Sequence, residues 1–221
     1  KTNSVLIEEY LVGEEMSFFT IHDGKTFKVF GTAQDHKRVN EGDKGKNTGG
    51  MGAYSPSRLA SHKLEKKIID KIILPTMKGL SDLGVTYKGF LYTGLMVIND
   101  EPYLIEYNVR MGDPECQTIL PTLKTDLLKI IMHCINGTLE ECSVNWHDTK
   151  SICIVLCSKG YPDKFEKNIP LKNLNKISNN ENNFLYHAGT TLIGNQIYSE
   201  GGRVLNFVSL SKNLYSGRKE I

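Results

Sequence analysis

Three polar residues near the middle of the chain have types and a spacing that suit metal and phosphate chemistry. Glu106, Asn108 and Arg110 directly follow the apolar residues 103–105, which favour a β-strand. Because side chains alternate between the two faces of a strand, all three point to one face. Carboxylate and amide oxygens suit Mg²⁺, and an arginine fork suits phosphate oxygens. The pattern predicts a Mg²⁺ and phosphate site, although taken alone it also fits a charged surface strand.

Two segments nearer the amino terminus carry further candidates. Residues 5–15 contain an acidic connector between two apolar runs. Residues 35–56 lack apolar periodicity and include T-G-G-M-G at 48–52, whose glycines allow positive φ and close backbone approach. We expect a long functional loop there, with amides that form an anion-binding nest. The same segments also fit a solvated connector and a flexible turn.

Strands that would position these residues follow from β-branched and aromatic runs. We expect strands at residues 5–12, 16–21, 26–31, 89–98 and 103–109, with turns at 23–24 and 99–102. This hairpin-rich order favours an α+β fold with an antiparallel sheet over residues 1–138.

Two helices are predicted to back that sheet. The first begins at the N-cap Ser61, kinks at Pro75 and stops at Gly84. The second spans residues 113–136, with Asp113 as its N-cap. Both would bury one apolar face against the strands.

The pattern changes after Gly137 to short strands and polar turns. We expect strands at residues 151–158, 184–193, 196–198 and 203–210, and an Asn-rich surface insertion at 173–183. These elements indicate a second, small, mainly β domain at residues 146–221.

Composition narrows the class of partner. The chain is 39% hydrophobic and 24% charged with a net charge of +2, which indicates neither a nucleic-acid nor a membrane partner. Residues 1–9 lack a secretory signal, and no apolar run reaches the roughly 18 residues of a membrane span. Five cysteines without a C-x-x-C pair predict reduced thiols. We expect a cytoplasmic protein with small-molecule partners; the oligomeric state stays open, a monomer included.

Five motifs in order resemble the glycinamide ribonucleotide synthetase family of ATP-grasp ligases. They are I-E-E-Y-L-V-G-E-E (7–15), Q-D-H-K-R (34–38), N-T-G-G-M-G-A-Y-S-P (47–56), G-F-L-Y-T-G-L-M (89–96) and I-E-Y-N-V-R-M-G-D-P-E (105–115). The resemblance covers nearly all of residues 5–137 and extends more loosely to the β domain. It implies the carboxyl-terminal half of an ATP-grasp domain followed by a small β-rich domain.

The resemblance also implies a role for each candidate residue. The adenine of ATP would lie at a hinge made of Glu8, Glu9, Tyr10 and Leu11, its ribose at Glu15, and the long loop would contact ATP through Arg38 and Asn47. The substrate would contact Gly49, Gly50, Met51, Gly52 and Asp113. Glu106 and Asn108 would hold Mg²⁺ or Mn²⁺, and Arg110 with the amides of Gly50 and Gly52 would stabilise the charge that develops in the reaction. Lys37 is left open between a ligand contact and a surface lysine.

The implied reaction joins glycine to 5-phosphoribosylamine at the expense of ATP, through glycyl phosphate, in purine biosynthesis. Another ATP-grasp carboxylate-amine ligase or carboxylase would share the hinge and the metal site, and a nucleotide-binding module without turnover is a third reading. The family's first ATP-grasp subdomain is not found here, so we expect an incomplete and inactive part of the ligase. The resemblance further implies a family helix between Leu214 and Tyr215, and whether residues are absent from this chain at that point stays open.

Overall fold

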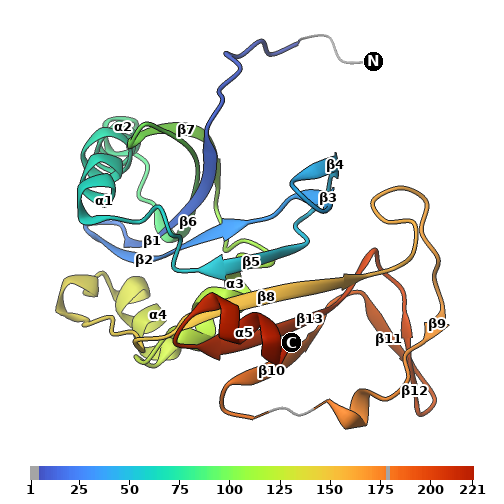
Figure 1. The fold of residues 1–221 in the computed structure, drawn as a ribbon. Coiled ribbons are helices and arrows are strands. Elements are labelled where there is room, and N and C mark those ends of the chain that lie inside the picture. The colour runs from blue at the N-terminus through green and yellow to red at the C-terminus, as the bar shows by residue number, and fades with distance from the viewer. Residues whose placement is uncertain (1–4, 178–179) are drawn as a thin grey trace.

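The computed structural model describes residues 5–177 and 180–221, and its centre is an eight-stranded antiparallel sheet (Figure 1). The strands lie in the order β10-β13-β8-β5-β2-β1-β6-β7. Their bounds are β1 (Glu14–Asp23), β2 (Phe27–Asp35), β5 (Gly52–Ser55), β6 (Lys88–Ile98), β7 (Glu101–Asn108), β8 (Lys150–Cys157), β10 (Asn183–His187) and β13 (Arg203–Ser211). This agrees with the predicted α+β fold.

Smaller sheets and helices complete the described part of the chain. One small sheet pairs β3 (Arg38–Asn40) with β4 (Lys44–Asn47), and another contains β11 (Thr190–Ile193), β12 (Gln196–Ser199) and β9 (Ile169–Pro170). The α-helices are α1 (His62–Ile68), α2 (Leu74–Asp82), α3 (Glu115–Ile119), α4 (Leu127–Asn136) and α5 (Leu214–Glu220). No helix among the described residues is long and apolar enough to cross a membrane.

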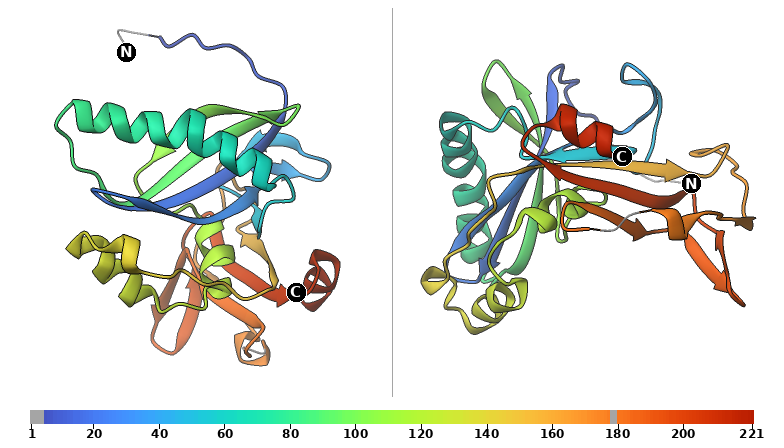
Figure 2. Two further views of the ribbon diagram at one scale, coloured as in Figure 1. Left: turned by 90° about the vertical axis from the view of Figure 1, so that its left-hand side faces the viewer. Right: turned by 60° about the horizontal axis from the view of Figure 1, so that its bottom comes forward.

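Helices cover both faces of the sheet around β1. On one face, α1 and α2 pack over Met16, Phe18 and Leu95, and on the other α3 and α4 pack over Phe19 and Phe30 (Figures 1 and 2). The fully buried Phe18 and Phe19 lie on opposite faces because they are adjacent in one strand. Each such side chain contributes roughly 1.5–3 kcal/mol of burial free energy. The layers thereby hold β6 and β7 in place beside β1.

The β6–β7 hairpin, which carries the predicted metal residues, is confirmed. Its connection is shorter than the expected 99–102 turn, since Asn99 and Asp100 alone form it with φ of 52° and 60°. Two positive φ values match the twist of antiparallel strands, and Asn and Asp tolerate them. Gly94 on β6 pairs with Glu106 on β7.

The first helix is confirmed and the second is not continuous. The Ser61 hydroxyl accepts from the Leu64 amide, and a π-helical stretch at Ile69–Ile73 immediately precedes Pro75, where a kink was expected. The prediction of a single helix at 113–136 was wrong. Helix α3 is followed by the 3-10 turn Leu120–Thr122. Helix α4 begins separately after Asp126, whose carboxylate accepts from the Lys129 amide. Proline in the 3-10 turn lacks the N–H that a continuing helix needs.

Three strand or loop predictions also need correction. Residues 5–12 have no secondary structure, because β-branched composition forms no strand without a neighbour to pair with. The loop at 35–56 contains the β3–β4 hairpin and β5, whose four residues join the main sheet. The strand at 184–193 is two strands, β10 and β11, in different sheets.

The two parts of the sequence share the main sheet. β5 pairs with β8, with Ala53 opposite Cys153, so backbone hydrogen bonds join residues from before Gly137 to residues after it. The boundary between 1–138 and 146–221 stays a prediction. The Asn-rich insertion falls partly outside the described residues, which resume at Asn180.

Candidate functional site

The predicted metal residues lie together at the end of β7. The Asn108 side-chain amide donates to Glu106 Oε1 at 3.1 Å, and Arg110 Nη2 reaches Asn108 Oδ1 at 3.4 Å. Glu106 and Asn108 therefore share one strand face, as alternation requires. The described residues contain no group of three or more His, Cys, Asp or Glu side chains that could cage a metal ion. A carboxylate and an amide oxygen at a solvent-accessible cavity fit Mg²⁺, which keeps water or phosphate oxygens as its other ligands.

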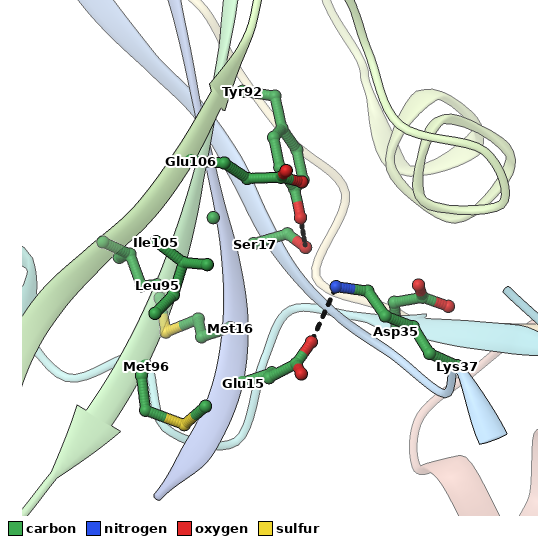
Figure 3. Close-up of a pocket in the computed structure, with 11 residues that line it drawn as sticks. Glu15, Met16, Ser17, Asp35, Lys37, Tyr92, Leu95, Met96, Ile105 and Glu106 are labelled. Atoms are coloured by element: carbon green, nitrogen blue, oxygen red, sulfur yellow. Dashed lines mark hydrogen bonds and ion pairs between the residues drawn. The ribbon is translucent and has the colours of Figure 1, made fainter. Parts of the chain in front are cut away.

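The cavity at this cluster adjoins two others, and together they form a cleft. One cavity is lined by Glu106, Asn108 and Arg110, and another by Tyr10, Leu11, Glu15, Arg38 and Asn47. Asp35 and Lys37 line both of these and also the smaller cavity between them (Figure 3). The structure therefore brings most of the predicted residues to one continuous cleft.

At one end of the cleft lie some, but not all, of the residues predicted to bind the nucleotide. Tyr10 lines the cavity but is 89% exposed, and Leu11 lies beside it. Glu8 and Glu9 are exposed and do not line it, so the structure does not bring these two to the site. Arg38 faces Asn47 across the β3–β4 hairpin.

Glu15 and Lys37 form an ion pair of 2.7 Å within this end of the cleft (Figure 3). Burial by itself lowers the pKa of Lys37, but the hydrogen bond and charge of Glu15 outweigh it, so the pKa lies above its usual value. Lys37 is thus a positively charged residue of the cleft, which favours the ligand-contact reading over a surface lysine.

At the other end, the expected anion-binding nest is wrong for three amides. Each donates to another protein group: Gly49 N to Tyr161 Oη at 2.9 Å, Gly50 N to Thr48 Oγ1 at 3.0 Å and Met51 N to the His36 carbonyl at 2.8 Å. An amide already engaged in this way offers no hydrogen to an anion. The segment therefore shapes the cleft wall with its backbone.

The glycines themselves are required by close packing. Gly50 has φ of 110°, and a Cβ there would lie 2.5 Å from Pro114 Cδ and 2.8 Å from Asp35 Oδ1. Gly52 is buried in β5, where a Cβ would meet the Cys153 carbonyl at 2.6 Å. Gly49 lines the cleft, whereas Met51 and Gly52 do not.

Arg203 is a cleft residue that the sequence analysis missed. From β13, its Nη1 donates to the carbonyls of Gly49 at 2.5 Å and Asp113 at 2.6 Å, and its Nη2 donates to Asp113 Oδ2 at 2.9 Å. The side chain is only 21% exposed. Its position after the Gly201-Gly202 turn was the available signal, but only the sheet brings it to residues 49 and 113.

Asp113 has a different local role from the one predicted. It is not the N-cap of α3, because Pro114 occupies that position without a side-chain cap. The Asp113 carboxylate instead pairs with Arg203 and accepts from Gln117 Nε2 at 2.7 Å. The residue still lines the cleft, so a substrate contact stays a prediction.

Asp35 is the second missed residue. It ends β2, and burial raises its pKa to about 7, helped by the nearby charge of Glu115. Among the described residues, its Oδ1 is buried and has no hydrogen-bond partner. Glu115 is only 4% exposed and accepts from Ser17 Oγ at 3.0 Å. Two neighbouring acids therefore lie in the cleft wall, and Lys37 is the positive charge that partly offsets them at Asp35.

Comparisons with known proteins agree with this architecture. Residues 1–116 match the family model described as "Phosphoribosylglycinamide synthetase, ATP-grasp (A) domain", and residues 151–221 match "Phosphoribosylglycinamide synthetase, C domain". The chain is 44% identical to a phosphoribosylamine–glycine ligase from Brucella melitensis, over 93% of this chain and 48% of the relative. A second such ligase, from Agrobacterium fabrum, is 44% identical over 95% of this chain and 49% of its own length.

Solved structures place the fold in the same group. A phosphoribosylamine–glycine ligase from Thermotoga maritima superposes with a TM-score of 0.84 and 31% identity, covering 96% of this chain and 52% of that one. A biotin carboxylase from Campylobacter jejuni has a TM-score of 0.68 at 13% identity, which shows a shared fold alone. The chain spans about half the length of the curated relatives it matches.

Proposed function

Because the chain belongs to the phosphoribosylglycinamide synthetase family, we propose that it supplies part of the active site of an ATP-dependent ligase that joins glycine to 5-phosphoribosylamine. The observation that carries the proposal is the Glu106, Asn108 and Arg110 cluster on one wall of a cleft. Lys37 and Gly49 line the same cavity. The products would be glycinamide ribonucleotide, ADP and phosphate. The reaction would be a step of purine biosynthesis in the cytoplasm.

Glu106 and Asn108 would hold Mg²⁺ or Mn²⁺. The bound ion would neutralise phosphate oxygens and so ease transfer of the γ-phosphoryl group. Arg110 lies next to the cluster and can offer its fork to phosphoryl or acyl-phosphate oxygens. Since no covalent step on the protein is needed, positioning and charge neutralisation supply the catalysis.

Binding roles follow from the two ends of the cleft. Glu15 would accept from the ribose hydroxyls after exchanging its contact with Lys37, whose ammonium would then face phosphate. Tyr10 and Leu11 would contact the adenine, with Arg38 and Asn47 opposite. The glycine substrate and the sugar phosphate would lie at the Gly49 and Asp113 end.

A substrate comparison on the full-length parent protein tests the proposal. With ATP and Mg²⁺, we expect turnover with glycine plus 5-phosphoribosylamine and none with bicarbonate or an aminoimidazole ribotide. Turnover with either alternative, and not with glycine, would assign the chain to another ATP-grasp reaction. Nucleotide binding with no turnover of any of these substrates would favour a binding module.

A further inference from the structure

Asp35 occupies a position in the cleft that the proposed roles leave unused. It lines all three adjoining cavities, between the end with Glu15 and the end with Glu106. Figure 3 shows Asp35 and Lys37 on one side of the central cavity and Glu106 with Tyr92 on the other. A group bound at the metal cluster would therefore lie across the central cavity from Asp35, whose carboxylate points away from Glu106 in this view.

The other acids that line the central cavity or the cavity at the metal cluster already have partners or other roles. Glu15 pairs with Lys37 at 2.7 Å, and Asp113 pairs with Arg203 at 2.9 Å. Glu115 on α3 is more deeply buried than Asp35, and Glu106 belongs to the metal cluster. Asp35 lines the cleft, and its buried Oδ1 lacks a hydrogen-bond partner among the described residues.

Amide formation can use a group with these properties. When an amine attacks an acyl phosphate, a C–N bond forms, the C–O bond to phosphate breaks, and the nitrogen must lose a proton. Phosphate leaves with the electron pair of the broken bond and ends as hydrogen phosphate, so the proton reaches it either directly or through a protein base that accepts it first. General bases of this kind act within hydrogen-bond reach of the amine and contribute about 10²–10⁴-fold in rate.

We propose that Asp35 is the catalytic base that accepts the proton lost by the attacking amine in the amide-forming step. The inference rests on the proposed function, since it needs an acyl phosphate and an amine in this cleft. The proposal gives the residues different roles. Glu106, Asn108 and Arg110 act in phosphoryl transfer, and Asp35 acts in the later attack of the amine on the acyl phosphate.

The groups that face Asp35 tune it for this role. Its pKa is raised to about 7, mainly by burial and also by the charges of Glu115 on α3 and Glu15 on β1, while Lys37 and the His36 amide lower it. A base works best when its pKa lies near the working pH. Glu115 is then a positioning residue that acts through the proton affinity of Asp35.

The test uses the full-length parent protein and separates the two steps. Isotope exchange within ¹⁸O-labelled ATP, measured with glycine present and amine absent, reports acyl-phosphate formation. Product formation with amine present reports the whole reaction. For Asp35→Asn we expect exchange within about threefold of wild type and ligation reduced by about 100-fold or more.

Equal losses of exchange and ligation in Asp35→Asn would overturn the proposal, as would ligation within a few-fold of wild type. If wild-type protein shows neither exchange nor ligation, the proposed function itself fails, and the two failures are thus distinct. Asp163→Asn is the matched control, because that carboxylate is 63% exposed and pairs with Lys46 outside the cleft. Circular dichroism and thermal unfolding check that each variant is folded.

Glu115→Gln provides a second readout at fixed Mg²⁺. It keeps the side-chain shape and an oxygen for Ser17 while removing the charge that raises the Asp35 pKa. We expect the acidic limb of kcat/KM for the amine to move to lower pH. An unmoved limb would remove Asp35 as the titrating base, whatever the size of the rate loss in Asp35→Asn.

Discussion

The two ends of the cleft are held in place in different ways. At the Gly49 end, Arg203 binds three backbone carbonyls and the Asp113 carboxylate, and Tyr161 accepts from the Gly49 amide. At the other end, residues 5–12 have no secondary structure and most of them are exposed. The end where charge would develop is preorganised by residues far apart in the sequence, as transition-state stabilisation requires. We expect the proposed nucleotide end to become ordered when its ligand binds.

The largest effect is expected at the metal cluster, in the preorganised region. In the full-length parent protein, Glu106→Gln removes a negative ligand while keeping its size, so kcat should fall roughly 100-fold to 1000-fold, as with other charge-stabilising groups in closed sites. Asn108→Ala should do less harm, because water can replace a neutral oxygen ligand. Measuring kcat against Mg²⁺ concentration checks both. Wild-type turnover in Glu106→Gln would exclude that residue from the site.

The buried carboxyl of Asp35 should lower the free energy of unfolding at neutral pH. In the folded protein its pKa is raised to about 7 from 3.8, so the unfolded chain loses the proton first as pH rises. Stability should therefore fall between pH 4 and pH 7 by at most about 4 kcal/mol. In urea unfolding of the 221-residue chain, Asp35→Asn should be more stable than wild type at pH 8 and equal near pH 4. No gain at pH 8 would mean that the carboxyl is well solvated or paired.

Gly50→Ala tests whether the substrate end is as tightly packed as it looks. The added Cβ would meet Pro114 and Asp35 at a positive φ, so the free energy of unfolding should drop by about 1–3 kcal/mol. Gly84→Ala is the control: φ there is 73° and no atom lies within 4 Å of the added Cβ. That change should cost only the backbone strain, about 1 kcal/mol. Equal losses in urea unfolding would show that packing at Gly50 contributes nothing.

Glu15→Gln tests the nucleotide end. Losing the charged acceptor should raise the KM for ATP about tenfold, or roughly 1.4 kcal/mol, with little change in kcat. Stability should hardly change, because its pair with Lys37 is 35% and 51% exposed. Asp70→Asn, which breaks an exposed pair with Lys66, is the control for general charge effects. A fall in kcat with KM unchanged would place Glu15 in the chemical step.

The smallest effect concerns hydrogen exchange in the 35–56 segment. The β3–β4 hairpin at 38–47 is exposed, so its amides should exchange quickly and slow several-fold when ATP, Mg²⁺ and glycine are added to the parent protein. Amides at 49–55 should exchange slowly even without ligand, because they bond to Tyr161, Thr48 and strands β2 and β8. If the amides of residues 35–56 all exchanged at similar rates, the proposed difference in order between the two ends of the cleft would be wrong.

Local patterns predicted the elements that depend on local physics. The β6–β7 hairpin, the helix from Ser61 and the shared face of Glu106 and Asn108 all follow from side-chain alternation, capping and turn residues. Predictions failed where a partner was needed. Residues 5–12 have strand-like composition but no neighbour, and β5 lies in a glycine-rich segment whose pairing with β2 and β8 makes it a strand.

The sequence by itself determined the family, the α+β class and the acidic and amide ligands on β7, because those depend on residue types at fixed local spacings. Only the tertiary structure decided that Arg203 ties residues 49 and 113 together and that the amides of 49–51 are already engaged. It also decided that Asp35 Oδ1 is buried without a hydrogen-bond partner in the described part of the chain, near the charge of Glu115. Burial and charge come from atoms distant in the chain, so a carboxyl's proton affinity is a property of the fold.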